Sequence, residues 1–275
     1  MARAHPLPSL DPLVDEAYDL FAAHRLSLPL HACGCENCLP ATLQEKFIRT
    51  PLRLLDLGLL TSWEESAAAS VAVARRNGEM EPGAAQIDAW STEVRALLPR
   101  IAQAVAEGTQ PSNLGVENTF RTIGSAGWQD WPEAERAFVQ RFAEAFFLAS
   151  INRAAFARAP IGPVLALDTD GQDAAIALII LGIDEERIIE LWEAAPDPNA
   201  AIHIAEARRS IRYDTETKCD TLDSVWLNDK WTGVRLGTWL TSPEIDERLE
   251  AAFFSLTGEE SEAQAMREIL SRALG

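Results

Sequence analysis

The segment 131–149, WPEAERAFVQRFAEAFFLA, decides the fold class. Its apolar side chains recur about every 3.6 residues, the period of an amphipathic α-helix with one buried face. They are Trp131, Ala134, Phe138, Phe142, Ala145 or Phe146, and Ala149. The same spacing recurs along most of the chain, and no stretch alternates apolar and polar residues as a half-buried strand does. We therefore expect an all-α fold, a compact bundle of about ten to twelve short helices.

Local start and stop signals predict where these helices lie. Asp11-Pro12 and Ser242-Pro243 each place a capping side chain before a proline at the start of a helix. Thr42–Glu45 and Ser62–Glu65 both match the capping-box pattern. A helix that follows the break Glu81-Pro82-Gly83 is expected to be interrupted or kinked at Pro99. A cysteine-rich loop lies between the first of these helices.

The domain organisation follows from one break in the pattern, Pro160 to Pro163. We expect an N-terminal helical part over 1–159, which contains the cysteine loop, and a C-terminal helical part over 160–275, the two packed as one globular unit. The apolar run 174–183 is shorter than the ~20 residues of a membrane span, so it predicts a buried helix and no membrane association. The polar stretch 213–223 is expected to be a loop.

The net charge of the chain limits which classes of molecule it can be expected to bind. The chain has 275 residues, 47% apolar and 24% charged, which is typical of a globular protein. Its 42 acidic and 24 basic residues give a formal charge of -18. This charge repels phosphate backbones, so nucleic acid is not expected as a partner, whereas a basic protein suits it. The alternative is that the acidity serves only the solubility of a bacterial protein. The N-terminal residues lack the apolar core of a secretory signal, so we expect a cytoplasmic location.

Three of the four cysteines lie in the segment Cys33-Gly34-Cys35-Glu36-Asn37-Cys38. Reduced, clustered cysteines in a cytosolic protein favour a metal over structural disulfides. The Cys35-x-x-Cys38 spacing lets two thiolates converge on one zinc ion, and the glycine at 34 lets Cys33 reach the same ion. The nearest candidate for the fourth ligand is His31; Cys219, His24 or a water molecule are the alternatives.

The same cysteines permit other chemistry. An open zinc position would make a hydrolase, with metal-bound water as nucleophile and Glu36 or a distant carboxylate as base. A redox sensor would link Cys35 to Cys38, with Cys33 as a resolving thiol. An iron–sulfur cluster would need Cys219 as its fourth thiolate. The sequence contains no zinc-protease, serine-hydrolase or P-loop motif, which favours a protein that is not an enzyme.

Four other groups of residues carry weaker signals. His203 matches a hydrogen-bonded core histidine better than a catalytic base. The pair Asp168 and Asp170 precedes a helix, so helix capping explains it more simply than a divalent metal. Carboxylates near Cys219 form either a solvated loop or a surface for a basic partner; they are Asp214, Glu216, Asp220 and Asp223. The tryptophans near the C-terminus include candidate anchors for a partner; they are Trp226, Trp231 and Trp239.

Several segments together resemble a bacterial family of uncharacterised proteins with an N-terminal Cys-x-Cys-x-x-Cys motif. They are Pro29-Leu30, the cysteine motif 33–38, 50–53, 98–100, 111–117, 128–131, 239–243 and 249–254. The resemblance implies an architecture and no mechanism, because the family has no established activity. The family often carries a histidine in the helix after the cysteine loop, near what is Ala67 to Ala69 here, and this chain has none there.

Taken together, the sequence predicts a non-catalytic, acidic, all-α protein that binds another protein. An inhibitor or immunity-type role against a basic toxin is one concrete form of this function. A structural zinc ion is expected at Cys33, Cys35 and Cys38, with His31 as the candidate fourth ligand.

Overall fold

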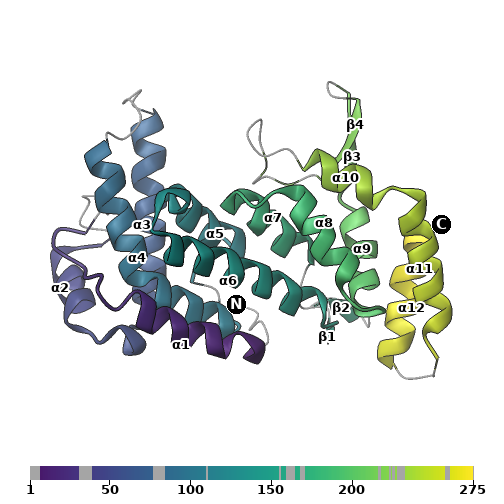
Figure 1. Cartoon of the computed structure of the whole chain (residues 1–275), viewed down its shortest axis with the longest axis horizontal. Coiled ribbons are helices and arrows are strands. Elements are labelled where there is room, and N and C mark those ends of the chain that lie inside the picture. The colour runs from purple at the N-terminus through teal and green to yellow at the C-terminus, as the bar shows by residue number, and fades with distance from the viewer. Residues whose placement is uncertain are drawn as a thin grey trace. The chain divides into compact units, whose positions relative to one another are not determined.

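A computed structural model describes residues 7–30, 39–76, 84–109, 111–154, 156–158, 165–167, 171–215, 218–222, 224, 227, 233–257 and 261–274. Within these residues the chain forms twelve α-helices, three short 3-10 helices and two antiparallel two-stranded sheets (Figure 1). The predicted all-α class is confirmed, since each strand has only three or four residues.

The chain divides into two compact units, Met1–Phe142 and Ala143–Gly275, and this division falls inside one helix, α6 (Glu133–Ile151). The boundary that the sequence predicts at residue 160 stays a prediction, because residues 159–164 lie outside the described part of the chain.

The first unit contains α4 (Ala84–Ala106), a helix of 23 residues. It packs against α1 (Asp11–Leu20) and α5 (Val116–Ser125), and α5 also contacts α3 (Leu57–Arg76). The other elements are α2 (Ala41–Arg49), the first part of α6, η1 (Pro8–Leu10), η2 (Leu52–Leu54) and η3 (Trp128–Asp130). Large side chains fill the core, among them Leu10, Leu60, Trp63, Leu97, Phe120 and Phe138.

The large side chains of the stripe in segment 131–149 are buried as predicted, whereas Ala134 is exposed and Ala145 and Ala149 are only partly buried. Phe138 and Phe142 are both almost completely inaccessible to solvent. The ring of Phe21, which follows α1, lies edge-on to Phe138 with 5.5 Å between ring centroids, and 6.2 Å from Trp131. Edge-to-face aromatic pairs of this kind stabilise a core beyond the burial of their area alone. The stripe therefore holds the beginning of α6 against the segment after α1.

Two predicted capping boxes are wrong, although the helices they announce exist. Helix α3 begins earlier than expected, because the Asp56 carboxylate accepts from the backbone N–H of Gly58 at 2.9 Å and of Leu59 at 3.3 Å. Ser62 lies inside this helix and donates to the Gly58 carbonyl. Helix α2 begins after Pro40, without a side-chain cap. A capping pattern marks a helix here but not the residue at which it begins.

Helix α4 continues through Pro99, so the predicted interruption does not occur. A proline inside a helix costs about 3 kcal/mol, because it removes one backbone hydrogen bond and crowds the preceding turn. Leu97, Leu98, Ile101 and Ala102 on both sides of Pro99 are buried. We attribute the continuity of α4 to this burial, which offsets the local cost.

The second unit contains the rest of the chain after α6. Helix α9 (Asn199–Arg208) packs against α7 (Gly171–Leu181), α11 (Pro243–Ser255) and α12 (Ser261–Leu274). Helix α10 (Val234–Leu240) packs against α8 (Glu185–Ala194) and strand β4. The strands are β1 (Phe156–Arg158), β2 (Leu165–Leu167), β3 (Ile211–Asp214) and β4 (Cys219–Leu222).

In this unit, the local sequence patterns agree with the helices that the structure shows. Every residue from Ala174 to Leu181 is buried, which confirms the predicted interior helix. Asp184 caps α8, since its carboxylate accepts from the backbone N–H of Glu186 at 2.9 Å. Helix α11 begins at Pro243, directly after Ser242, as expected.

The polar stretch 213–223 is not simply a loop. β3 and β4 form an antiparallel hairpin in which Tyr213 lies opposite Asp220 and Ile211 opposite Leu222. Helix α10 approaches β4 so closely that a Cβ on Gly237 would lie 2.7 Å from the carbonyl oxygen of Asp220. The hairpin is thus stabilised by packing against a later helix, a contact that an alternation pattern does not encode.

Candidate functional site

The predicted zinc ligands His31, Cys33, Cys35 and Cys38 lie outside the described residues. The two residues that flank this segment are described, and one side chain holds both of them. The Gln44 oxygen accepts from the backbone N–H of Leu30 at 3.0 Å, and its amide nitrogen donates to the carbonyl of Leu39 at 2.9 Å. Leu30 and Leu39 are also buried. The two ends of the cysteine segment are therefore held near each other.

His24, an alternative fourth ligand, lies in a polar triad of the first unit. Its Nε2 is 3.1 Å from Oε1 of Glu135, and Arg95 donates from Nε to Oε2 of the same carboxylate at 2.6 Å. The Arg95 guanidinium also lies over the ring of Trp131. Glu135 thus bridges a cation and an imidazole and links the segment after α1 to α4 and α6. Cys219, the other alternative, is the first residue of β4 in the second unit.

His203 is a core histidine, as the sequence favours. It is fully buried, and the backbone N–H of Gly171 donates to its Nδ1 at 3.1 Å. Because Nδ1 is an acceptor, Nε2 carries the proton and donates to the Arg153 carbonyl at 2.9 Å. Both ring nitrogens form hydrogen bonds that connect the start of α7 to the residues just after α6. Neither nitrogen is therefore available as a base for a substrate.

The other nominated residues are only partly described. Asp168, Asp170, Glu216, Asp223, Trp226 and Trp231 lie outside the described ranges. Asp220 accepts from the Thr241 hydroxyl at 3.0 Å. Trp239 packs on Trp192 with 5.8 Å between ring centroids, and its indole N–H donates to Glu193. Trp239 therefore stabilises the contact between α10 and α8.

Glu64, on α3, is a buried carboxylate whose pKa is strongly raised. Its side chain is almost sealed, and Thr122 of α5 donates to Oε1 at 3.0 Å while Thr119 approaches Oε2 at 3.5 Å. Burial raises the pKa of Glu64 from 4.5 to about 7; the two hydroxyl donors and the charge of Arg121 act in the opposite direction. Glu64 is thus close to half protonated at neutral pH.

Sequence reasoning missed Glu64 because it assigned 62–65 to a helix cap. The available signal was its position one turn after Leu60 and directly after Trp63, both of which are buried. The surroundings of Glu64 are polar and paired: Trp63 donates to Glu93 at 3.0 Å, and Asn118 donates to Ser112 at 2.9 Å. In the part of the chain that the structure describes, no buried side-chain nitrogen or oxygen lacks a hydrogen-bond partner. The cluster is a satisfied polar contact between helices.

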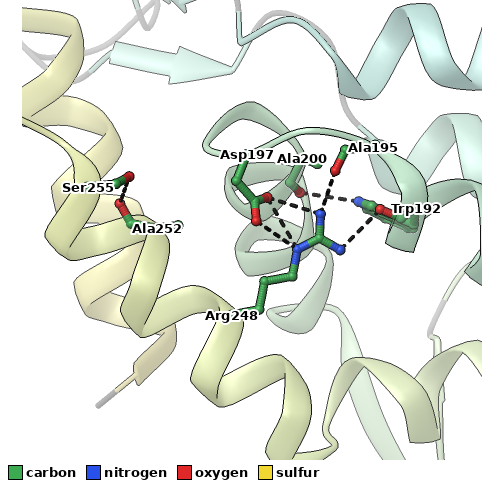
Figure 2. A network of polar contacts seen from close by, with 7 residues as sticks. All are labelled: Trp192, Ala195, Asp197, Ala200, Arg248, Ala252 and Ser255. Atoms are coloured by element: carbon green, nitrogen blue, oxygen red, sulfur yellow. Dashed lines mark hydrogen bonds and ion pairs between the residues drawn. The ribbon is translucent and has the colours of Figure 1, made fainter.

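A second feature missed from the sequence is the orientation of Arg248, the one basic residue of α11. Figure 2 shows its guanidinium pointing away from α11 toward the C-terminal end of α8. It donates to the carbonyls of Trp192 at 3.0 Å and Ala195 at 2.8 Å, and to both oxygens of Asp197. Arg248 therefore supplies a charged donor to carbonyls at the end of α8, where the backbone offers few donors, although the Trp192 carbonyl also accepts from the Ala195 N–H at 3.2 Å. The outward face of α11 consequently keeps only acidic charge.

That outward face is exposed and carries a large apolar side chain. Phe254 is 77% exposed. Glu247 and Glu250 precede it by seven and four residues, so the three side chains share one side of the helix. Both carboxylates are exposed, and neither joins an ion pair within the described residues. We call this set, Glu247, Glu250 and Phe254, the α11 face.

Among the described residues, no helix is both long and apolar enough to cross a membrane. No group of three or more histidine, cysteine or acidic side chains in these ranges is arranged to hold a metal ion.

No known protein family, curated protein or solved structure matches this chain. The resemblance to the cysteine-motif family stays a prediction.

Proposed function

We propose that this chain is a non-catalytic, acidic helical protein that works by binding a basic protein partner in the cytoplasm. An inhibitor or immunity-type role against a basic toxin is the concrete form of this proposal. The partner carries the positive charge that this chain lacks, which speeds encounter and rejects acidic competitors.

The observation that supports the proposal is how the chain uses its own positive charge. Among the described residues, at least eleven arginines form ion pairs with carboxylates of the same chain. They are Arg49, Arg53, Arg95, Arg100, Arg141, Arg187, Arg208, Arg209, Arg235, Arg248 and Arg272. Exposed carboxylates such as Asp19, Asp88 and Glu247 have no such pair in the same ranges. Much of the positive charge is thus neutralised by ion pairs within the chain, and the unpaired carboxylates are exposed to solvent.

The proposal includes a structural zinc ion held by Cys33, Cys35 and Cys38, with His31 as the fourth ligand. The spacing of the thiols supports it, because a Cys-x-x-Cys pair lets two thiolates converge on one tetrahedral zinc ion. Gln44 supports it as well, since it holds Leu30 and Leu39 on either side of the run. A zinc ion there would fix the connection between α1 and α2.

Affinity capture tests the proposed function. The tagged chain is immobilised and exposed to bacterial lysate at low and at moderate salt, and retained proteins are identified by mass spectrometry. We expect a basic protein that binds more weakly as salt rises but is still retained at moderate salt. The control bait is an unrelated protein of equal net charge. Proteins that this control also retains bind by simple ion exchange and are discounted. Retention of the same proteins by both baits, or of none by the chain, would contradict the proposal.

A further inference from the structure

We infer that the α11 face is the docking site for the basic partner, with Phe254 inserted into an apolar pocket of that partner and Glu247 and Glu250 paired with its basic side chains. This inference rests on the proposed function and deepens it, because it assigns the partner to one side of one helix.

The first argument is the exposure of Phe254. A phenylalanine that is 77% exposed leaves most of its ring in water, whereas the neighbouring Phe253 is partly buried and lies 5.4 Å from it, edge to face. Aromatic side chains surrounded by a polar rim are common anchors of protein interfaces. Single exposed apolar residues are ordinary on protein surfaces, so exposure alone does not identify a site.

The second argument is the charge around Phe254. Every basic side chain described on α11 and α12 is engaged elsewhere: Arg248 binds the end of α8, Arg272 pairs with Glu268, and Arg267 donates to the Leu256 carbonyl at 3.5 Å. Asp246, at the margin of the face, pairs with Arg208 at 2.7 Å. Glu247 and Glu250 therefore lie on the same side as the exposed ring without an ion pair among the described residues.

The exposed aromatic ring and the two carboxylates together favour one kind of binding partner for the α11 face. A second copy of the chain would bring the same acidic face and a further charge of -18, so self-association through this face is opposed by repulsion. Nucleic acid and anionic membranes are repelled for the same reason. A protein that offers arginine or lysine around an apolar pocket satisfies both the carboxylates and the ring.

The chain offers a matched control. Leu54 is 73% exposed, nearly as much as Phe254, but it follows Arg53, whose guanidinium lies 3.9 Å from the centre of the Tyr18 ring and pairs with Asp15. The surroundings of Leu54 are thus balanced in charge. If exposure alone attracted the partner, both positions would matter equally.

The test measures binding of the purified basic protein that the wild-type chain retains, by calorimetry, for four variants. The single variant Phe254→Ala is compared with the single variant Leu54→Ala. The double variant Glu247→Gln/Glu250→Gln is compared with the double variant Asp11→Asn/Asp19→Asn. The two double variants remove the same charge. We expect Phe254→Ala to weaken binding about tenfold or more, and the α11 double variant to weaken it several-fold at low salt and less at high salt. The control variants should stay within about twofold.

The outcomes separate the two proposals. If the wild-type chain retains no basic protein, the proposed function and this inference both fail. If it binds one and all four variants bind equally well, the function stands and the α11 face is not the site. Sedimentation of the free chain adds a third outcome: a dimer that Phe254→Ala dissociates would make a second copy the occupant and overturn the inference. Circular dichroism of each variant confirms that it is folded.

Discussion

Replacing Glu64 with glutamine removes a titrating group from the interior of the first unit and leaves its shape almost unchanged. The amide oxygen of glutamine can still accept from the Thr122 hydroxyl, which lies 3.0 Å from Glu64 Oε1. The pKa of Glu64 is about 7 in the folded chain and 4.5 as the ordinary value. A shift of this size corresponds to about 3 kcal/mol of differential stabilisation between the two protonation states.

The direction of the pH dependence follows from the raised pKa. Between about pH 4.5 and 7 the folded chain keeps the proton that the unfolded chain has lost. The stabilisation from this proton is complete below the unfolded pKa of 4.5 and is lost as the pH rises through about 7. The Glu64→Gln variant has no proton to lose, so relative to wild type it should gain about 3 kcal/mol in the free energy of unfolding over this range.

Urea denaturation at several pH values measures this difference, with hydrogen exchange of α3 as a probe specific to the first unit. Glu65→Gln is the control, because Glu65 carries the same charge on the same helix but is partly exposed and bound to Asn113. Its stability should keep the pH dependence of wild type, reduced only by the small part of the Glu64 pKa shift that the charge of Glu65 contributes. Parallel curves for wild type and Glu64→Gln would refute the assignment of a proton to the buried carboxylate.

Three further predictions concern other parts of the chain. Arg248→Ala should lower the free energy of unfolding of the second unit by about 2–4 kcal/mol, because two carbonyls and a carboxylate lose a charged donor, and Arg248→Lys should recover only part of this in urea denaturation. Gly237→Ala should destabilise the same unit by about 1–3 kcal/mol, since its Cβ would lie 2.7 Å from a backbone oxygen of β4, and exchange of the β3–β4 amides would report it. Mass spectrometry of the native protein should find about one zinc ion per chain that is lost in Cys35→Ser and Cys38→Ser but kept in Cys219→Ser; zinc retained in all three would exclude the predicted site.

The sequence by itself determined the helical class and the positions of most helices, because the signals for both are local. The pair Ser242-Pro243 marks a helix start within two residues of chain, and the stripe of segment 131–149 repeats within a single helix. Such signals were less exact for the residue at which a helix begins, since Asp11 lies inside α1 and Pro40 rather than Thr42 precedes α2. Pro99 does not interrupt α4, and Asp56 rather than Ser62 caps α3.

The candidate sites divide in the same way. The cysteine spacing, the net charge and the interpretation of His203 as a core residue came from the sequence. The burial of Glu64 against α5, the bridge that Glu135 makes between His24 and Arg95, and the turning of Arg248 toward α8 came only from the tertiary structure. Each of these contacts joins residues forty or more positions apart. Composition sets how much charge a chain carries, but only the packing of its helices decides which charges are paired inside and which, like those of the α11 face, are left for a partner.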